Sequence, residues 1–93
     1  GVRLSLAPSA SVGAPAAGKI SYAGHYRSYG QIVIIEHGGG WTTLITNLAD
    51  LSVSDGETVR QGQKLGTVSD DNPQISLELR RHGRTMDVAA LFL

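Results

Sequence analysis

Glycines divide this chain into short runs, and their spacing limits the choice of fold more than any other feature. Twelve glycines occur in 93 residues, and they separate segments rich in Val, Ile, Leu, Thr and Tyr at intervals typical of β-hairpins. No segment has the length and periodicity of an ordinary α-helix. The spacing predicts an all-β fold, a small antiparallel and barrel-like sheet with little or no helix.

The middle of the chain predicts a central hairpin. Residues 19–23 follow a turn at residues 14–18 and form a short strand. Residues 31–37, Gln-Ile-Val-Ile-Ile-Glu-His, form a β-branched run that suits a strand buried on both faces. Three glycines at residues 38–40 permit the positive φ values of a tight turn. Residues 41–48 are therefore predicted to be the antiparallel partner.

The second half predicts a small meander and a closing strand. Residues 53–66 combine inward-pointing apolar residues with turns at Gly56 and Gly62. After a polar loop at residues 69–73, residues 74–80 alternate polar and apolar side chains, which places the polar set on one face of a strand.

Five apolar residues of these strands are expected in the core: Val33, Ile34, Leu44, Leu77 and Leu79. A turn is predicted at residues 82–83. Asp87 is expected to cap a final helical turn over residues 88–93, whose Leu91 and Phe92 would complete the core.

Composition supports one small globular domain spanning residues 1–93, since 41% of residues are hydrophobic and only 17% are charged. Eight basic and eight acidic residues cancel, which argues against nucleic acid or an anionic membrane surface as partner. The absence of cysteine excludes disulfides and thiolate metal sites. No apolar run is long enough for membrane insertion, and no signal peptide is visible.

The order of the segments is informative in itself. The ordered set is residues 14–24, Tyr29-Gly30, residues 33–37, residues 40–44, the two-glycine corner at residues 53–66, and residues 77–80 followed by Gly83 and Asp87. Biotinyl and lipoyl carrier domains share the paired Val-x-x-Gly corners, but no lysine lies in the exposed turn where a carrier is modified. Over essentially its whole length the chain resembles the LytM-like (lysostaphin-type) zinc metallopeptidases. The resemblance implies the LytM fold, which is similar to a duplicated hybrid motif.

The same resemblance implies that the metal site is degenerate. Active members bind one zinc through a histidine and an aspartate of an N-terminal motif and the last histidine of a His-x-His strand, and two more histidines serve in catalysis. Arg3 falls at the aspartate position, and the preceding histidine would lie before Gly1, so the N-terminal part of the full domain is expected to be missing. Ser76 replaces the last ligand, and Asn47 and Gln74 replace the catalytic histidines.

These residue types argue against zinc chemistry. A catalytic zinc needs about three ligands drawn from imidazole, carboxylate or thiolate. A serine hydroxyl and a glutamine amide are poor zinc donors, and the permanent charge of Arg3 repels the ion. We therefore expect no cofactor and no peptidase activity.

The remaining polar candidates favour structural roles. His25, His37 and His82 lie in separate loops or strand ends without metal-ligand spacing, and His37 is expected to orient the glycine hairpin. Glu78 lies on the polar face of its strand and could act as an acid or base, but Arg80 is expected to pair with it.

The resemblance places a groove at the former substrate site. Asn47, Gln74 and Ser76 would form a polar floor suited to a peptide or glycan backbone. For Tyr26 and Tyr29, exposure at the groove rim and packing remain equally open.

Three functions follow from the resemblance. The first is a regulatory domain of the bacterial envelope, in the periplasm or otherwise extracytoplasmic, that acts in cell division. Its partner would be a peptidoglycan hydrolase, an amidase that it activates as degenerate LytM-like activators do, or another cell-wall protein. The second is a scaffold module that binds peptidoglycan itself. The third, which requires a different ligand alignment, is an active zinc endopeptidase.

Overall fold

The computed structural model of the chain describes residues 1–82 and 84–86. Its elements are β1 (Val2–Ser5), β2 (Ser11–Gly13), β3 (Gly18–His25), the 3₁₀ turn η1 (Arg27–Tyr29), β4 (Gln31–Gly38), β5 (Trp41–Leu48), β6 (Asp50–Leu51), β7 (Thr58–Val59), β8 (Lys64–Thr67), β9 (Gln74–Arg81) and β10 (Arg84–Met86). The all-β prediction is confirmed, with η1 as the only helical element in the described part of the chain.

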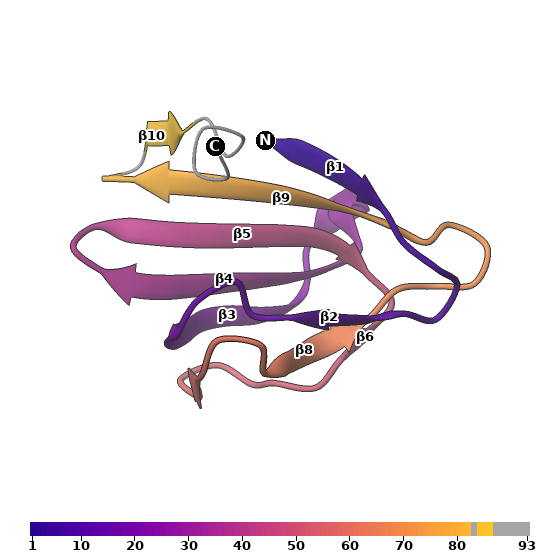
Figure 1. Cartoon of the computed structure of the whole chain (residues 1–93), viewed down its shortest axis with the longest axis horizontal. Coiled ribbons are helices and arrows are strands. Elements are labelled where there is room, and N and C mark those ends of the chain that lie inside the picture. Colours follow the sequence, from indigo (N-terminus) through magenta and orange to yellow (C-terminus); the bar gives the residue numbers. More distant parts are fainter. Residues whose placement is uncertain (83, 87–93) are drawn as a thin grey trace.

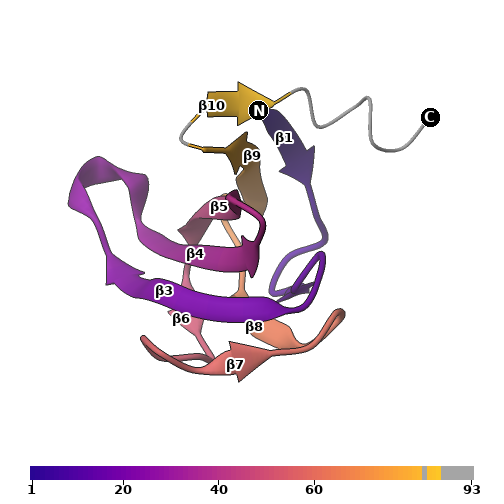
Figure 2. The ribbon, with the colours of Figure 1, turned by 90° about the vertical axis from the view of Figure 1, so that its left-hand side faces the viewer.

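Two antiparallel sheets make up the fold (Figures 1 and 2). The large sheet has the order β1-β9-β5-β4-β3-β7, and β10 pairs with the far end of β9. The small sheet has the order β2-β8-β6 and lies against one face of the large sheet. This arrangement leaves the opposite face of β4, β5 and β9 without a second layer among the described residues.

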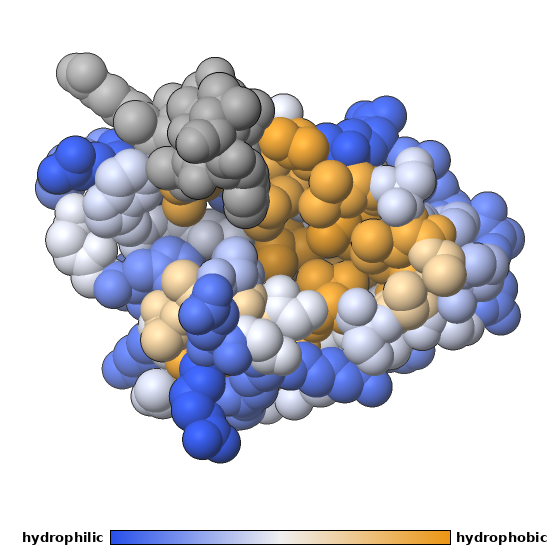
Figure 3. Space-filling view, in the orientation of Figure 1, coloured by the Kyte–Doolittle hydropathy of each residue, from blue (hydrophilic) through white to orange (hydrophobic). Residues whose placement is uncertain are grey.

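The core fills the space between the two sheets. Its largest fully buried apolar side chains are Ile20, Ile35, Ile45, Leu65, Val33, Val59 and Val68. Figure 3 shows the face of the molecule on which β2 crosses the large sheet. Hydrophobic residues gather on this face over β1, β9 and β5. Leu6 and Leu77 are among the half-buried residues that extend the core there.

The predicted core is wrong for Ile34, Leu44 and Leu79, and partly right for Leu77, which packs against the core. Val33 is buried, whereas Ile34, Leu44, Leu77 and Leu79 are half-buried. Ile34 and Leu44 are each next to a core residue in their strands. Because successive side chains of a strand point to opposite faces, both point to the open face of the sheet. The strand at residues 31–37 is thus covered by a second layer on one face only.

A β-bulge in β3 changes which side chains reach that open face. Ile20 pairs with Ile35, but the register then shifts, so that Tyr22 pairs with Ile34. Directly opposite residues of an antiparallel pair point to the same face. Ile20 therefore points into the core with Ile35, while Tyr22 points to the open face with Ile34, although only one residue separates Ile20 from Tyr22.

The turns follow the glycine pattern. Gly38, Gly39 and Gly40 all have positive φ in the β4–β5 turn, so the predicted hairpin is confirmed. His37 does not orient this turn as expected. Its Nδ1 lies 2.7 Å from the carbonyl oxygen of Ala17, and its Nε2 lies 2.6 Å from Oγ1 of Thr43. The ring therefore joins the segment before β3 to β5.

The strand bounds agree closely with the predictions at β5 and β9, whereas β3 extends further in both directions than residues 19–23. β1, β2, β6 and β10 were not predicted. The expected turn begins at His82, whose φ is 50°. Gly83, Asp87 and the predicted helical turn with Leu91 and Phe92 lie outside the described residues.

Candidate functional site

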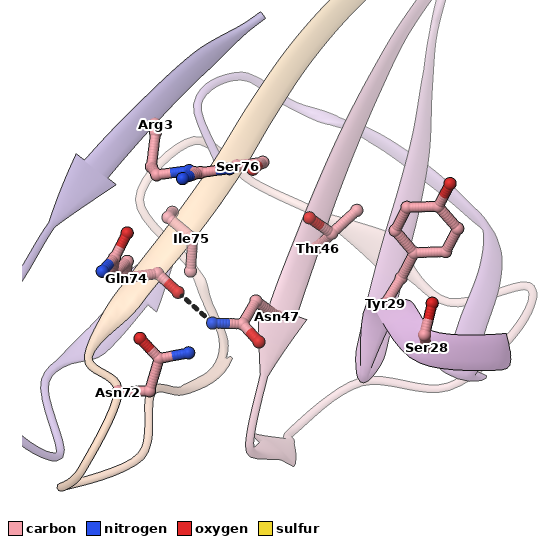
Figure 4. Close-up of a pocket in the computed structure, with 9 residues that line it drawn as sticks. All are labelled: Arg3, Ser28, Tyr29, Thr46, Asn47, Asn72, Gln74, Ile75 and Ser76. Atoms are coloured by element: carbon pink, nitrogen blue, oxygen red, sulfur yellow. Dashed lines mark hydrogen bonds between the residues drawn. The ribbon is translucent and has the colours of Figure 1, made fainter.

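Three neighbouring strands place one residue each in a row across the open face. Arg3 of β1 lies opposite Ser76 of β9, and Ser76 lies opposite Thr46 of β5 on its other side. Residues paired in this way share a face, with Cβ atoms about 5 Å apart. Figure 4 shows the side chain of Arg3 extending from β1 across β9 toward Ser76. The guanidinium group therefore lies beside a serine hydroxyl at the β1 edge of the open face.

Asn47 joins the ends of two of these strands. Its backbone φ of 72° lies in the left-handed region, which asparagine tolerates better than most residues. Its side-chain Nδ2 donates a hydrogen bond of 2.6 Å to the carbonyl oxygen of Gln74 (Figure 4). The register between β4 and β5 shifts across residues 46–47. Asn47 thus stabilises an irregular backbone and holds the start of β9.

A polar pocket of about 320 Å³ opens beside the row. Its lining is Arg3, Ser28, Tyr29, Thr46, Asn47, Asn72, Gln74, Ile75 and Ser76 (Figure 4). Arg3 is the only charged residue among the described residues of this lining. In the described part of the chain, its guanidinium forms no hydrogen bond or ion pair with another residue.

A larger groove of about 760 Å³ adjoins the polar pocket and shares Arg3, Tyr29, Thr46 and Ser76 with it. We call it the apolar groove. The described residues that line it are Arg3, Tyr22, Tyr26, Tyr29, Ile32, Ile34, Leu44, Thr46, Ser76, Glu78 and Arg80. Its aliphatic members come from adjacent strands, β4 and β5.

The apolar groove corrects the expectation of a polar floor. Asn47, Gln74 and Ser76 do come together, but in the polar pocket at one end. Sequence reasoning missed Ile32, Ile34 and Leu44 because a β-branched run looks the same whether its second face is covered by a sheet or open to a ligand. The alternation of Leu44 and Thr46 with the core residues Thr43 and Ile45 was the available signal.

Three tyrosines form one wall of the apolar groove. The ring centroids of Tyr22 and Tyr26 lie 6.5 Å apart in an edge-on arrangement, and those of Tyr26 and Tyr29 lie 6.3 Å apart with nearly parallel planes. The Tyr22 hydroxyl donates a 2.8 Å hydrogen bond to the carbonyl oxygen of His25. Tyr26 and Tyr29 remain 43% and 56% exposed. They are therefore rim residues that also contact each other.

Glu78 and Arg80 form the expected ion pair, with Nη2 of Arg80 2.9 Å from Oε2 of Glu78. Both line the apolar groove. Among the described residues of the lining, two arginines and one glutamate leave one positive charge in excess. The ion pair joins Glu78 to Arg80, so Arg3 is the arginine without a counter-ion in the described part.

The donors present do not fit a zinc ion. The row offers a guanidinium and two hydroxyls, and the pocket adds amides, none of which is a preferred zinc ligand. Within residues 1–82 and 84–86, no three His, Asp or Glu side chains gather closely enough to hold a metal ion.

Two features characterise the chain: a curved antiparallel sheet backed by a small sheet, and an open groove across the middle strands. The sequence profile of Peptidase family M23 matches residues 1–88. The chain belongs to this family.

Three relatives illustrate the range of the family. The chain is 35% identical over 68 residues to the cell division protein DipM of Caulobacter vibrioides, covering 68% of the chain and 11% of that protein. It is 31% identical over 91 residues to outer membrane antigenic lipoprotein B of Haemophilus influenzae, covering 94% and 22%. It is 30% identical over 91 residues to the murein hydrolase activator EnvC of Escherichia coli, covering 94% and 22%. The chain thus spans less than a quarter of each relative.

Solved structures show the same fold. Helicobacter pylori Csd3 superposes with a TM-score of 0.89 at 17% identity, over 97% of this chain and 25% of that one. Lysostaphin superposes with a TM-score of 0.85 at 20% identity, over 97% and 40%. The expected lysostaphin-type fold is confirmed.

In the described part of the chain no helix is long and apolar enough to cross a membrane.

Proposed function

We propose that this chain is a degenerate, non-catalytic domain of the M23 family, spanning residues 1–93, that binds and activates a peptidoglycan amidase through its groove. The polar pocket and the apolar groove, with Tyr26 and Tyr29 at the rim, are the proposed binding surface. The proposed location is the periplasm or another extracytoplasmic part of the bacterial envelope. Relatives named as a murein hydrolase activator and as an outer membrane lipoprotein support this proposal.

One observation carries the proposal: the groove is present, but the row Arg3–Ser76–Thr46 within it contains no zinc ligand. A guanidinium at the centre of a metallopeptidase site opposes a divalent cation by charge. The groove beside it nevertheless combines an aliphatic floor with an aromatic rim. Tyrosine is enriched among the few residues that contribute most of the affinity of protein interfaces. Binding without hydrolysis is the function that these two features support together.

A peptidoglycan-binding scaffold is the second candidate. The polar pocket favours it, because amides and hydroxyls can hydrogen-bond a glycan or a stem peptide. The aliphatic floor favours the protein partner, since large apolar side chains can be buried on Ile32, Ile34 and Leu44.

The test is a titration of the purified chain with a peptidoglycan amidase from its source organism. Tyr26→Ala, Tyr29→Ala and Ser76→Glu should each weaken binding about tenfold or more, because they remove rim area or place a charge in the pocket. Release of dye from labelled sacculi by the amidase should rise in the presence of the chain. Thr58→Ala on the exposed surface of β7 is the matched control and should bind like the parent.

Each variant is first checked for folding by its thermal unfolding midpoint. If all three folded groove variants bind the amidase like the parent, the groove is not the site. If the chain pulls down with purified sacculi and not with the amidase, the scaffold function replaces this one.

A further inference from the structure

We propose that the groove recognises a carboxylate next to a large apolar side chain on an extended segment of the partner protein, with Arg3 as the residue that binds the carboxylate. This inference rests on the proposed function, because it specifies the chemistry of the segment that the same groove would bind. Its starting point is the charge of Arg3, for which the described part of the chain provides no counter-ion.

The surroundings of Arg3 suit an anion. The other described residues that line the polar pocket are neutral, and several carry hydroxyl or amide donors: Ser28, Tyr29, Thr46 and Ser76 among the hydroxyls, Asn72 and Gln74 among the amides. Nδ2 of Asn47 is already engaged with the Gln74 carbonyl. An arginine flanked by hydroxyl groups can give a carboxylate two charge-assisted hydrogen bonds and further neutral ones.

Glu78 is the acidic residue among the described lining of the apolar groove, and no ion pair between it and Arg3 is formed. Glu78 is paired with Arg80 at 2.9 Å. A ligand carboxylate would therefore compete with no other described carboxylate for Arg3.

The apolar half of the ligand follows from the spacing along β5. Thr46 lies in the row beside Ser76, and Leu44 lies two residues away on the same face, next to Ile34 in register. Two residues of an extended strand span about 7 Å. An extended segment would thus place an acidic side chain against Arg3 and Ser76, and an apolar side chain two positions along against Leu44 and Ile34.

This spacing favours a protein segment over a peptidoglycan stem peptide. A stem peptide supplies carboxylates, but its alanine methyl groups are too small to cover an aliphatic floor. Leucine, methionine or phenylalanine would bury far more apolar area there, at about 25 cal/mol per Å². Charge complementarity with Arg3 and apolar area on β4 and β5 therefore point to the same kind of occupant.

The probe for this inference is the peptide acetyl-Ala-Leu-Ser-Glu-Ala-amide, with glutamine in place of glutamate as its matched counterpart. Titration into ¹⁵N-labelled chain should shift the amide resonances of Arg3, Thr46 and Ser76. The glutamate peptide should bind about three- to tenfold more tightly than the glutamine peptide, as expected for one partly exposed charge pair. Arg3→Gln should abolish that preference. Arg60→Gln, which changes an exposed arginine outside both linings, should leave it intact.

Equal affinity of the two peptides, a preference that survives Arg3→Gln, or no shift of these resonances at about 10 mM peptide would each overturn the inference. Tighter binding of a purified stem peptide than of the glutamate peptide would overturn the choice of a protein segment. The amidase titration separates this inference from the proposed function. Loss of amidase binding in the tyrosine variants but not in Arg3→Gln would reject the carboxylate and keep the function, whereas a peptide preference without any amidase binding would reject the function alone.

Discussion

Asn47 has a positive φ, and its side chain donates to the carbonyl oxygen of Gln74. By resemblance this is the position of a catalytic histidine. The asparagine thus has a structural task that is independent of catalysis: it supports a left-handed backbone and supplies a donor to a half-buried carbonyl. Arg3 is different, because its guanidinium contacts nothing charged in the described part of the chain. The two substituted positions therefore differ in kind, one serving the fold and the other available to a ligand.

At the residue scale we predict that the chain contains no stoichiometric zinc and that Gln74→His with Ser76→His does not restore cleavage of peptidoglycan. The reason is the charge of Arg3, which lies opposite position 76 and opposes a metal ion. Adding Arg3→Asp should raise the affinity for zinc above that of the double variant. Competition with a chromophoric chelator measures the affinity, and elemental analysis measures the content.

About one zinc per chain in the parent protein would show that the ligand positions were misassigned. Cleavage of sacculi by the Gln74→His, Ser76→His variant would show the same, since Arg3 remains in it.

At the scale of the element, each middle strand serves two environments. β4, β5 and β9 send one set of side chains into the core and the alternate set to the open groove. Ile45 and Leu77 are directly opposite each other on the core face, but Ile45 is 1% exposed while Leu77 is half-buried and only packs against the edge of the core. Position in the sheet, and not residue type, separates them.

We therefore predict that Ile45→Ala costs about 2–5 kcal/mol of unfolding free energy, through lost burial and the cavity left behind. Leu77→Ala should cost less, about 1–2 kcal/mol, because part of that side chain is already in water. Urea denaturation of both variants measures the difference. Ser76→Ala, on the opposite face of β9, is the control and should change stability by less than about 1 kcal/mol. An equal or larger loss in Leu77→Ala would place Leu77 in the core and contradict this assignment of faces.

The sequence predicts most elements but not the use of their faces. Period-two alternation correctly placed Gln74, Ser76 and Glu78 on one face of β9, and three glycines located the β4–β5 turn. The floor of the groove could not be predicted, because Ile32 and Ile34 satisfy the pattern of a doubly buried strand equally well. The bulges in β3 and at residues 46–47 also leave no propensity signal, although each changes the direction of the residues that follow.

At the scale of the whole molecule, the charges balance and leave no long-range field of one sign. Eight basic and eight acidic residues give a formal net charge of zero, and the described lining of the groove carries a single excess positive charge. Encounter with a partner is then governed by shape and short-range contacts more than by electrostatic steering.

We predict that the dissociation constant for the amidase rises less than about fivefold between 50 and 300 mM NaCl. One partly exposed charge pair is screened over this range, whereas apolar burial in the groove is not weakened by salt. Fluorescence anisotropy at several salt concentrations provides the measurement, and Arg3→Gln should flatten the dependence further. A fall in affinity of a hundredfold or more would indicate a broad electrostatic interface in place of the groove.

The bulge in β3 gives the tyrosine wall an unusual origin. The register shift sets whether Tyr22 points to the groove or to the core. The wall therefore depends on which face of β3 each residue points to as much as on the amino acids themselves. If β3 kept all its residues but ran without this register shift, Tyr22 would pair with Val33 and point into the core, without a change in any aromatic residue. In this fold, then, a shift of strand register can abolish a binding surface that a comparison of aligned residues would score as fully retained.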